Sequence, residues 1–355
     1  MTMRKLVTGL AASVLILAAL GPAASAQPQG AGAPDGQKAA SGAKSWTPRR
    51  TPWGDPDLRG TWPLDSLART PFQRSEKLGD RAFLSDEEYA AALKSAAELR
   101  SRFAAEEKAG KLGLGHWTEY GEPLRQTSLI VEPANGRLPP MTDQGKALAA
   151  GMKSSWSQKV FDDLSDFNSL DRCITRGMPA SMLPFPYNNG VRIFQAPGYV
   201  VLQLELVHET RIIPLDGRPP LPGQMTTWLG SSRGHFEGNT LVIETANFNG
   251  EAPMVIVGPT NQPVPTSHAL RITERLTPTG PNTLQYEARV EDPDVLTAPW
   301  RMSFPWTRND GYKLYEYACH EGNEQLGNYI KATSPRFAAA RQARKAAEQA
   351  SADGR

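Results

Sequence analysis

Cysteine and histidine are scarce in this sequence of 355 residues, which contains two cysteines and five histidines. Because the two cysteines lie far apart and no H-E-x-x-H pattern occurs, neither a structural zinc site nor a zinc-protease motif is expected. The sequence also lacks the G-x-S-x-G pattern of serine hydrolases, the P-loop and the glycine-rich dinucleotide pattern. We therefore expect no cofactor and no serine nucleophile.

The sequence also has no large excess of positive or negative charge. It contains 39 Lys and Arg residues and 37 Asp and Glu residues, for a formal net charge of +2. No basic stretch is interleaved with aromatic residues, so nucleic acid is not an expected partner. Glycine (31) and proline (30) are by contrast abundant and indicate many turns. The composition is that of a globular protein with a small molecule as its expected partner, and it indicates no oligomeric state.

No apolar run in the sequence is long enough for a confident membrane span, which needs about 20 residues. The longest one, Leu6–Leu20, follows the basic residues Arg4 and Lys5 and precedes the small residues Ala24–Ala26. This order is typical of a secretory signal peptide with its cleavage site. We predict that residues 1–26 are removed on export, that no membrane span remains, and that the mature protein is periplasmic or secreted.

Export determines how the two cysteines are interpreted. In an oxidising compartment two cysteines usually pair, so we predict a disulfide between Cys173 and Cys319. The alternative is a thiol nucleophile at Cys319 beside His320 as its base. That alternative requires a lowered thiol pKa and protection from oxidation.

The chain after the signal peptide divides into four predicted parts. Residues 27–45 lack large apolar side chains and predict a flexible linker. Residues 46–165 form a mixed, partly helical segment, residues 166–333 a β domain, and residues 334–355 a charged helical tail.

Two helices are predicted in the mixed segment. The clear one is Asp86–Lys108, which Ser85 and Glu88 begin with a capping box and whose apolar residues share one face. A second, short helix is predicted after Thr142.

Strand patterns dominate from about residue 190 onward. Apolar and polar residues alternate in segments that are separated by short turns, which predicts about nine antiparallel strands. The predicted turns are Pro197-Gly198, Gly238-Asn239, Gly280-Pro281-Asn282 and Asp310-Gly311. This pattern predicts a mainly β fold, an antiparallel up-and-down barrel or strongly curved sheet of lipocalin-like type, with the helix of the mixed segment packed outside. A barrel of this size can enclose one small ligand.

Two histidines fall at predicted strand ends, where the mouth of a barrel places its chemistry. His208 and His320 each precede a glutamate, Glu209 or Glu321. Side chains alternate along a strand, so Glu316 is predicted on the same face as His320. The alternative is a solvated outer face, on which such residues carry no function.

A His–Glu pair with an arginine nearby suits general acid–base catalysis, in which the arginine holds a carboxylate or a developing oxyanion. The predicted catalytic residues are Glu205, His208, Arg211, Glu316 and His320. The predicted ligand-binding residues are Tyr187, Asn188, Trp228, Arg233, Trp300 and Tyr317. We assign no metal ligands, although a metal held by the two histidines and a carboxylate stays an alternative.

Several long motifs carry a resemblance to a known family. They are TPWGDPDLRGTW (51–62), TSLIVEPANGRLPP (127–140), DRCITRGMP (171–179), PFPYNNG (184–190), HETRIIPLDGRP (208–219), EGNTLVIETANF (237–248) and YEYACHEGN (315–323). Together they resemble a large family of exported bacterial proteins without an assigned function, from residue 46 onward. The resemblance implies export and no particular activity. A shorter similarity, Gly60–Trp62, resembles the Gly-x-Trp of lipocalins, although packing alone accounts for a buried tryptophan.

Two functions follow as hypotheses. The first is an exported enzyme that performs acid–base chemistry, as a lyase, isomerase or hydrolase, on a small carbohydrate-derived or aromatic substrate bound in a barrel. The alternative is a lipocalin-like protein that binds a small apolar ligand without converting it. Ionisable side chains that converge in the lumen favour the enzyme, and an apolar lumen favours the binding protein.

Overall fold

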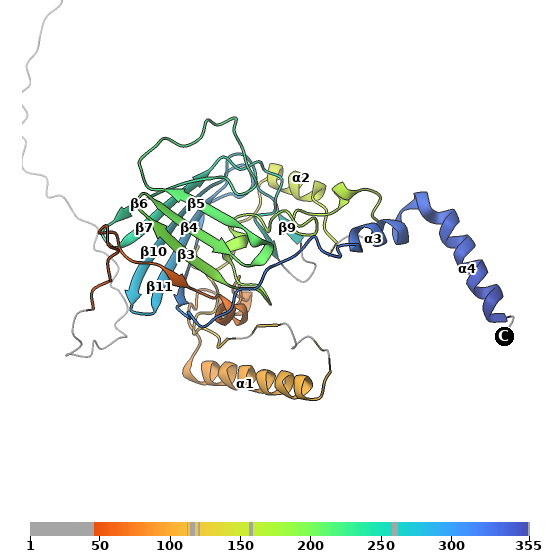
Figure 1. Cartoon of the computed structure of the whole chain (residues 1–355), viewed down its shortest axis with the longest axis horizontal. Helices are drawn as coiled ribbons and strands as arrows, with labels where there is room; N and C mark the ends of the chain where they lie inside the picture. The colour runs from red at the N-terminus through yellow and green to blue at the C-terminus, as the bar shows by residue number, and fades with distance from the viewer. Residues whose placement is uncertain are drawn as a thin grey trace, which may run out of the picture. The chain divides into compact units, whose positions relative to one another are not determined.

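The computed structural model describes residues 46–111, 113, 118–119, 121–155, 159–257 and 262–353 (Figure 1). These residues belong to one compact unit, Trp46–Arg355. The predicted signal peptide and linker lie outside the described residues.

The fold is mainly β, as the sequence predicted, and all strand pairs of the described residues are antiparallel. One sheet has the order β1-β3-β4-β5, a second the order β2-β12-β11-β10-β7-β6, and β8 pairs with β9. The strands of the first sheet are β1 (Gly60–Thr61), β3 (Val191–Ala196), β4 (Tyr199–Leu204) and β5 (Thr210–Pro214). Those of the second are β2 (Ile130–Glu132), β6 (Ser231–Glu237), β7 (Thr240–Ala246), β10 (Arg271–Gly280), β11 (Thr283–Glu291) and β12 (Trp300–Thr307). The small pair is β8 (Val255–Val257) and β9 (Gln262–Val264).

Four α-helices and several short 3₁₀ turns accompany the strands in the described part of the chain. The α-helices are α1 (Asp86–Lys108), α2 (Asp143–Gly151), α3 (Gln325–Thr333) and α4 (Ala338–Asp353). The 3₁₀ turns are η1 (Asp65–Arg69), η2 (Glu76–Leu78), η4 (Leu164–Asp166), η5 (Ala180–Met182), η6 (Leu206–His208) and η7 (Pro335–Phe337).

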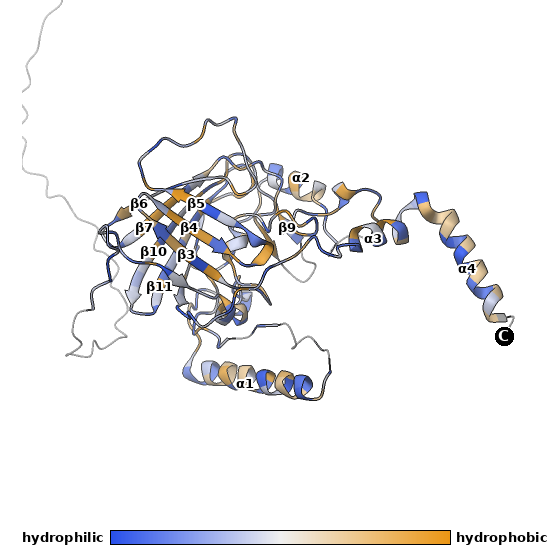
Figure 2. Cartoon of the chain, in the orientation of Figure 1, coloured by the Kyte–Doolittle hydropathy of each residue, from blue (hydrophilic) through white to orange (hydrophobic). Residues whose placement is uncertain are grey.

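The two larger sheets pack face to face through a shared hydrophobic core. Alternate residues of β3 and β4, such as Ile193 and Leu202, are buried against residues of β7 and β11, such as Ile243 and Tyr286. Figure 2 shows polar and apolar residues alternating along the strands, as expected when one face of a sheet is buried and the other is solvated. The core therefore lies between the sheets.

Three of the four predicted hairpin turns are confirmed. The pairs Ala196–Tyr199, Glu237–Thr240 and Gly280–Thr283 close the hairpins β3–β4, β6–β7 and β10–β11. Gly198 and Gly238 have φ values of 78° and 60°, a conformation that a side chain disfavours. Local turn chemistry was sufficient to locate these hairpins.

The predicted closed barrel is wrong, because the two sheets stay separate. β5 and β6 form no ladder, and the segment that joins them, residues 215–230, contains Pro219, Pro220 and Pro222, which have no backbone N–H to donate. At the opposite edge, β1 has only two residues, and the N–H of Asn309 donates to the carbonyl oxygen of Thr61 at 2.9 Å without extending a ladder.

The predicted hairpin at Asp310-Gly311 is also wrong, because residues 308–320 form no strand. The N–H of Tyr315 donates to Oε1 of Glu205 at 2.8 Å instead of to a neighbouring strand. The predicted alternation of Glu316 and His320 therefore does not apply. A similar correction concerns His208, since β4 ends at Leu204 and the chain turns through η6 before β5 begins.

Helix α1 begins with a capping box, in which Ser85 accepts a hydrogen bond from the N–H of Glu88 and the Glu88 carboxylate accepts one from the N–H of Ser85. Ala96 is the helix residue that is buried. Packing of this helix against the outside of a barrel is therefore not supported.

The predicted disulfide is present, since Cys173 and Cys319 are bonded across 146 residues of sequence. It joins the loop before η5 to the irregular segment that follows β12. Among the described residues, no helix has the length and hydrophobicity needed to cross a membrane.

Removing this bond will destabilise the protein, because the bond restricts the unfolded chain over a long loop. We expect the Cys173→Ser/Cys319→Ser double variant to lose about 2–4 kcal/mol of unfolding free energy, measured by urea titration. Thiol counting in denatured, unreduced wild-type protein is the control. Two reactive thiols per chain would contradict the disulfide.

Candidate functional site

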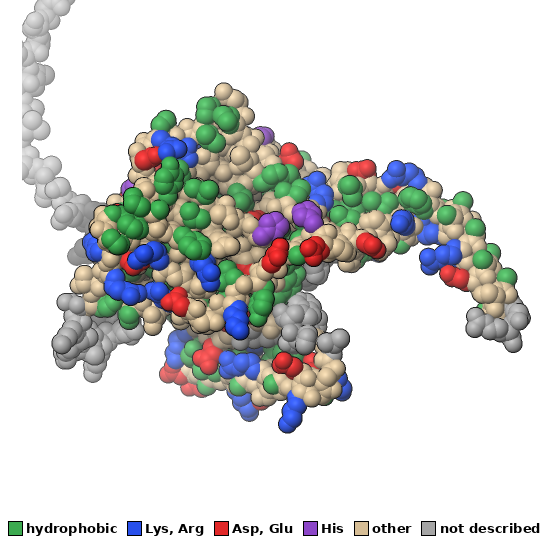
Figure 3. All heavy atoms as spheres, in the orientation of Figure 1, with side chains coloured by type: hydrophobic (Ala, Val, Ile, Leu, Met, Phe, Trp, Pro, Cys, Tyr) green, Lys and Arg blue, Asp and Glu red, His purple; other side chains and the backbone are tan. Residues whose placement is uncertain are grey.

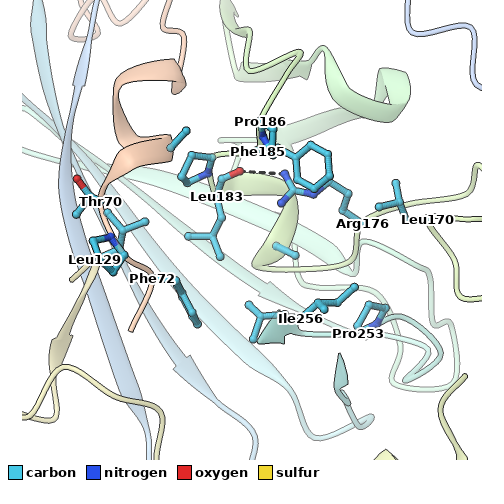
Figure 4. Close-up of a pocket in the computed structure, with 15 residues that line it drawn as sticks. Thr70, Phe72, Leu129, Leu170, Arg176, Leu183, Phe185, Pro186, Pro253 and Ile256 are labelled. Atoms are coloured by element: carbon cyan, nitrogen blue, oxygen red, sulfur yellow. Dashed lines mark hydrogen bonds between the residues drawn. The ribbon is translucent and has the colours of Figure 1, made fainter. Parts of the chain in front are cut away.

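A cavity with a volume of about 570 Å³ lies beside the core, not between the two sheets. Three stretches of chain form most of its walls: the end of η1 and the residues after it, the residues from η5 onward, and the residues around the start of β8. Leu129, Leu170 and Arg176 complete the lining. The lining residues are Ala68, Thr70, Pro71, Phe72, Leu129, Leu170, Arg176, Ala180, Leu183, Pro184, Phe185, Pro186, Pro253, Val255 and Ile256 (Figure 4). The lining is almost entirely apolar.

The local sequence explains this apolar wall. Four of the lining residues are prolines, and proline exposes no backbone N–H that would need a partner. Gly177 lets two walls approach closely, because a Cβ there would lie 2.1 Å from the carbonyl oxygen of Pro253. The PFP sequence (184–186) and Gly177 thus shape the cavity.

Arg176 is the one charged residue of the lining. Its Nη1 donates to the carbonyl oxygen of Leu183 at 2.9 Å, and its guanidinium lies 4.6 Å from the ring centroid of Phe185 (Figure 4). Burial lowers the pKa of Arg176 to about 10, opposed by the nearby Glu209. A guanidinium with this pKa is still a cation at neutral pH.

Glu209 lies at the backbone side of Arg176. Its Oε1 accepts hydrogen bonds from the Thr175 hydroxyl and, at 3.2 Å, from the N–H of Arg176, and the residue is 6% exposed. Its Oε2 accepts no hydrogen bond of good geometry from the described residues, although the Ser181 hydroxyl is close enough to lower its pKa. Burial outweighs these contacts and raises the pKa of Glu209.

Phe185 connects the cavity wall to two of the predicted ligand-binding residues. It packs edge-on against Tyr187 with ring centroids 4.9 Å apart, and Tyr187 stacks on Tyr317 at 6.4 Å. Burial is the main cause that raises the pKa of Tyr317 above its usual value, and the neighbouring Tyr187 raises it further. Both tyrosines lie near the cavity without being part of its lining.

The predicted histidines come together, but on the surface. The ring centroids of His208 and His320 are 6.4 Å apart, and both side chains are exposed. Figure 3 shows two adjacent histidines on the surface with acidic side chains beside them. Nδ1 of His208 is 3.1 Å from the carbonyl oxygen of Tyr317, while Glu316 is exposed. No lining residue of the cavity belongs to this group.

Glu205 is buried, and its carboxylate accepts hydrogen bonds from backbone N–H groups. Its carboxylate accepts hydrogen bonds from Asn188 Nδ2 at 3.0 Å and from the N–H groups of Gly190 and Tyr315 at 3.0 and 2.8 Å. The Tyr312 hydroxyl lies between this carboxylate and that of Glu119, at 2.8 and 2.7 Å. Glu205 and Asn188 therefore attach the segment after β12 to the start of β3.

Arg211 lies inside the core and forms a buried ion pair with Glu274 of β10. Its side chain is 2% exposed and that of Glu274 is 0% exposed. Arg211 also donates to Ser232 and Thr245, at 3.3 and 3.2 Å, and the Tyr286 hydroxyl donates to Glu274 at 2.9 Å. Burial and the carboxylate hold the pKa of Tyr286 well above its usual range. All of these partners are protein groups.

The remaining predicted residues are dispersed. Trp300 is fully buried and packs edge-on against Phe72, with ring centroids 5.7 Å apart. Trp228 lies beside Arg172, whose guanidinium is 5.9 Å from the indole ring. Arg233 lines a smaller cavity of about 220 Å³ at the gap between β5 and β6.

The sequence-based reasoning missed Arg176, Glu209 and Glu274. The first two lie within the quoted motifs DRCITRGMP and HETRIIPLDGRP, so the motifs pointed to the right segments but not to these side chains. Neither residue belongs to a recognisable catalytic pattern. Within the described ranges, no three metal-ligating side chains cluster to form a metal site.

Comparisons with known proteins add little. No family model matches the chain, and no curated protein matches it. A solved structure of a secretary abundant heat soluble (SAHS) protein from Ramazzottius varieornatus is similar at 13% sequence identity and a TM-score of 0.22, over 44% of this chain and 100% of that one. This likeness is too slight to support an argument. The resemblance to exported bacterial proteins stays a prediction.

The Arg211–Glu274 pair generates a stability prediction. Glu274→Gln leaves a buried guanidinium without its counter-charge, so we expect a loss of about 3–5 kcal/mol of unfolding free energy in urea. Glu244→Gln, at an exposed position of β7, is the matched control and should change it by less than about 0.5 kcal/mol. Equal effects of the two variants would contradict a structural role for the pair.

Glu209 generates a prediction about pH. Its folded-state pKa is above the usual 4.5, so its contribution to stability is fully present below that pH and is lost as pH rises through the folded pKa. Glu209→Gln cannot ionise. We therefore expect the variant to lose less unfolding free energy than wild type between about pH 4.5 and 8, measured by urea unfolding. Identical pH profiles would contradict the raised pKa.

Proposed function

We propose that this chain is an exported binding protein that holds one small, mainly apolar molecule in the 570 Å³ cavity and does not convert it chemically. The observation that supports this proposal is the cavity itself. Its volume falls within the range of about 300–1,000 Å³ found for small-molecule sites, and its lining is apolar with few polar groups, as such sites are. Aromatic and proline side chains offer flat surfaces to an apolar ligand.

The proposal differs from the lipocalin-like hypothesis in one respect. The space between the two sheets is occupied by large side chains, including Tyr286, Phe304 and Trp306, all at 0% exposure. Tyr286 and Trp306 stack with ring centroids 4.8 Å apart. The ligand site that we propose therefore lies beside the sandwich of sheets, not in a lumen.

Acid–base catalysis, the first hypothesis from the sequence, has less support. Glu205 and Arg211 bond to structural partners, although Nε of Arg211 has no partner among the described residues. His208, Glu316 and His320 are exposed and do not line the cavity. The observation that still favours catalysis is the proximity of the two histidine rings. Export is part of our proposal and is supported by the disulfide and by the signal-like N-terminal sequence.

The cavity is tested with N-phenyl-1-naphthylamine, an uncharged apolar dye whose fluorescence rises on leaving water. We expect saturable binding to wild type and at least about tenfold weaker binding to Ala68→Phe, because the new ring occupies the cavity. Ala97→Phe, at an exposed position of α1, is the matched control and should bind as wild type does. Fluorescence titration provides the dissociation constants.

The same dye tests whether the two histidines belong to the binding site. The His208→Ala/His320→Ala double variant should bind it as tightly as wild type, since neither ring lines the cavity. Lost binding in this variant, or unchanged binding in Ala68→Phe, would place the site elsewhere. Failure of wild type to bind the dye at all would refute the proposed function.

A further inference from the structure

Arg176 has more hydrogen-bond donors than the protein uses. A guanidinium carries five N–H groups, and one contact from the Arg176 guanidinium to a protein acceptor is found among the described residues, that to Leu183. None of the described carboxylates forms an ion pair with it. Glu209, the nearest acidic group named among its electrostatic neighbours, bonds to the backbone N–H of Arg176 and not to the guanidinium.

Arg176 is only partly buried, whereas Arg74 and Arg211 are buried, and these two arginines have more protein acceptors. Arg74, at 2% exposure, donates to the hydroxyl of Thr127 and to the carbonyl oxygens of Gly79 and Ala134. Arg211 contacts both oxygens of Glu274. Arg74 and Arg211 thus each have at least two protein acceptors, although Nε of Arg211 has none among the described residues. Arg176, by contrast, has one protein acceptor among the described residues and lines an apolar cavity, where a charge without a hydrogen-bonded partner raises the free energy of the folded protein.

The position of the guanidinium is also fixed. Leu183 binds one of its amino groups through a carbonyl oxygen, and the ring of Phe185 lies against its face at 4.6 Å (Figure 4). A guanidinium held in this way presents its remaining N–H groups in a planar fork, which matches the two oxygens of a carboxylate.

We infer that the ligand of this cavity carries one carboxylate, which Arg176 receives, on an otherwise apolar body that packs against Phe72, Leu129 and Val255. This inference rests on the proposed function and names the chemical class of its ligand. The class is a small apolar monocarboxylic acid. The carboxylate would accept hydrogen bonds from the guanidinium N–H groups for which the described residues supply no acceptor.

The test compares decanoate with decan-1-ol, which share a chain length and differ in the acidic group. Each is used to displace N-phenyl-1-naphthylamine from the full-length wild-type protein at pH 7. We expect decanoate to displace the dye at a concentration at least about tenfold lower than decan-1-ol, because its carboxylate forms a charge-assisted pair that the alcohol cannot form. Arg176→Met should abolish this difference between decanoate and decan-1-ol.

Two further variants serve as controls. Arg176→Lys keeps the charge and should retain part of the preference for decanoate. Arg233→Met removes an arginine from the smaller cavity and should leave the preference unchanged. A melting curve for each variant shows whether it is folded.

A measurement on wild type alone keeps the inference testable if Arg176→Met does not fold. Below about pH 4 the ligand carboxyl is largely protonated, so the preference for decanoate should disappear. A preference that persists there would overturn the inference. Dye binding with equal displacement by acid and alcohol at pH 7 would refute the acidic ligand and leave the proposed function standing, whereas absent dye binding refutes both.

Discussion

The ion pair between Arg211 and Glu274 lies where the two sheets meet, and the arrangement of the core depends on it. β5 and β10 belong to different sheets that share no ladder, so this buried pair is a direct polar connection between them. Ser232, Thr245 and Tyr286 add further hydrogen bonds to the pair. Such a pair contributes more to the relative position of the sheets than to net stability, because desolvation offsets most of its attraction.

This polar cluster and the aromatic residues around it fill the space between the sheets. The ligand site that we propose lies instead in the cavity of about 570 Å³, which is formed mainly by loops beside the sheets. Loops carry function in many folds because a rigid scaffold positions them. Here the disulfide adds to that rigidity, since Cys173 lies three residues before Arg176 and is bonded to the segment that also packs Tyr317 against Tyr187.

The predictions from sequence were accurate where a feature depends on residues close together in the chain, and less accurate where it depends on distant residues. Gly198 and Gly238 identified their hairpins because a two-residue turn is decided by the residues in it. Asp310-Gly311 offered the same local signal and failed, because the carboxylate of Glu205, distant in sequence, bonds to the N–H of Tyr315. His208 and His320 lie close together, although neither stands at a strand end at the mouth of a barrel, as the sequence argument assumed.

By itself the sequence determined the mainly β class, three hairpins and the disulfide, since each depends on short-range pattern or on there being a single cysteine pair. Only the tertiary structure decided that the two sheets do not close into a barrel and that Arg211 forms an ion pair with Glu274. It also placed Arg176 in the lining of a cavity. The physical reason is that an arginine has the same local sequence signature whether its partner is a carboxylate or an empty apolar wall. What distinguishes Arg211 from Arg176 is which distant groups the fold places within hydrogen-bonding distance of each guanidinium.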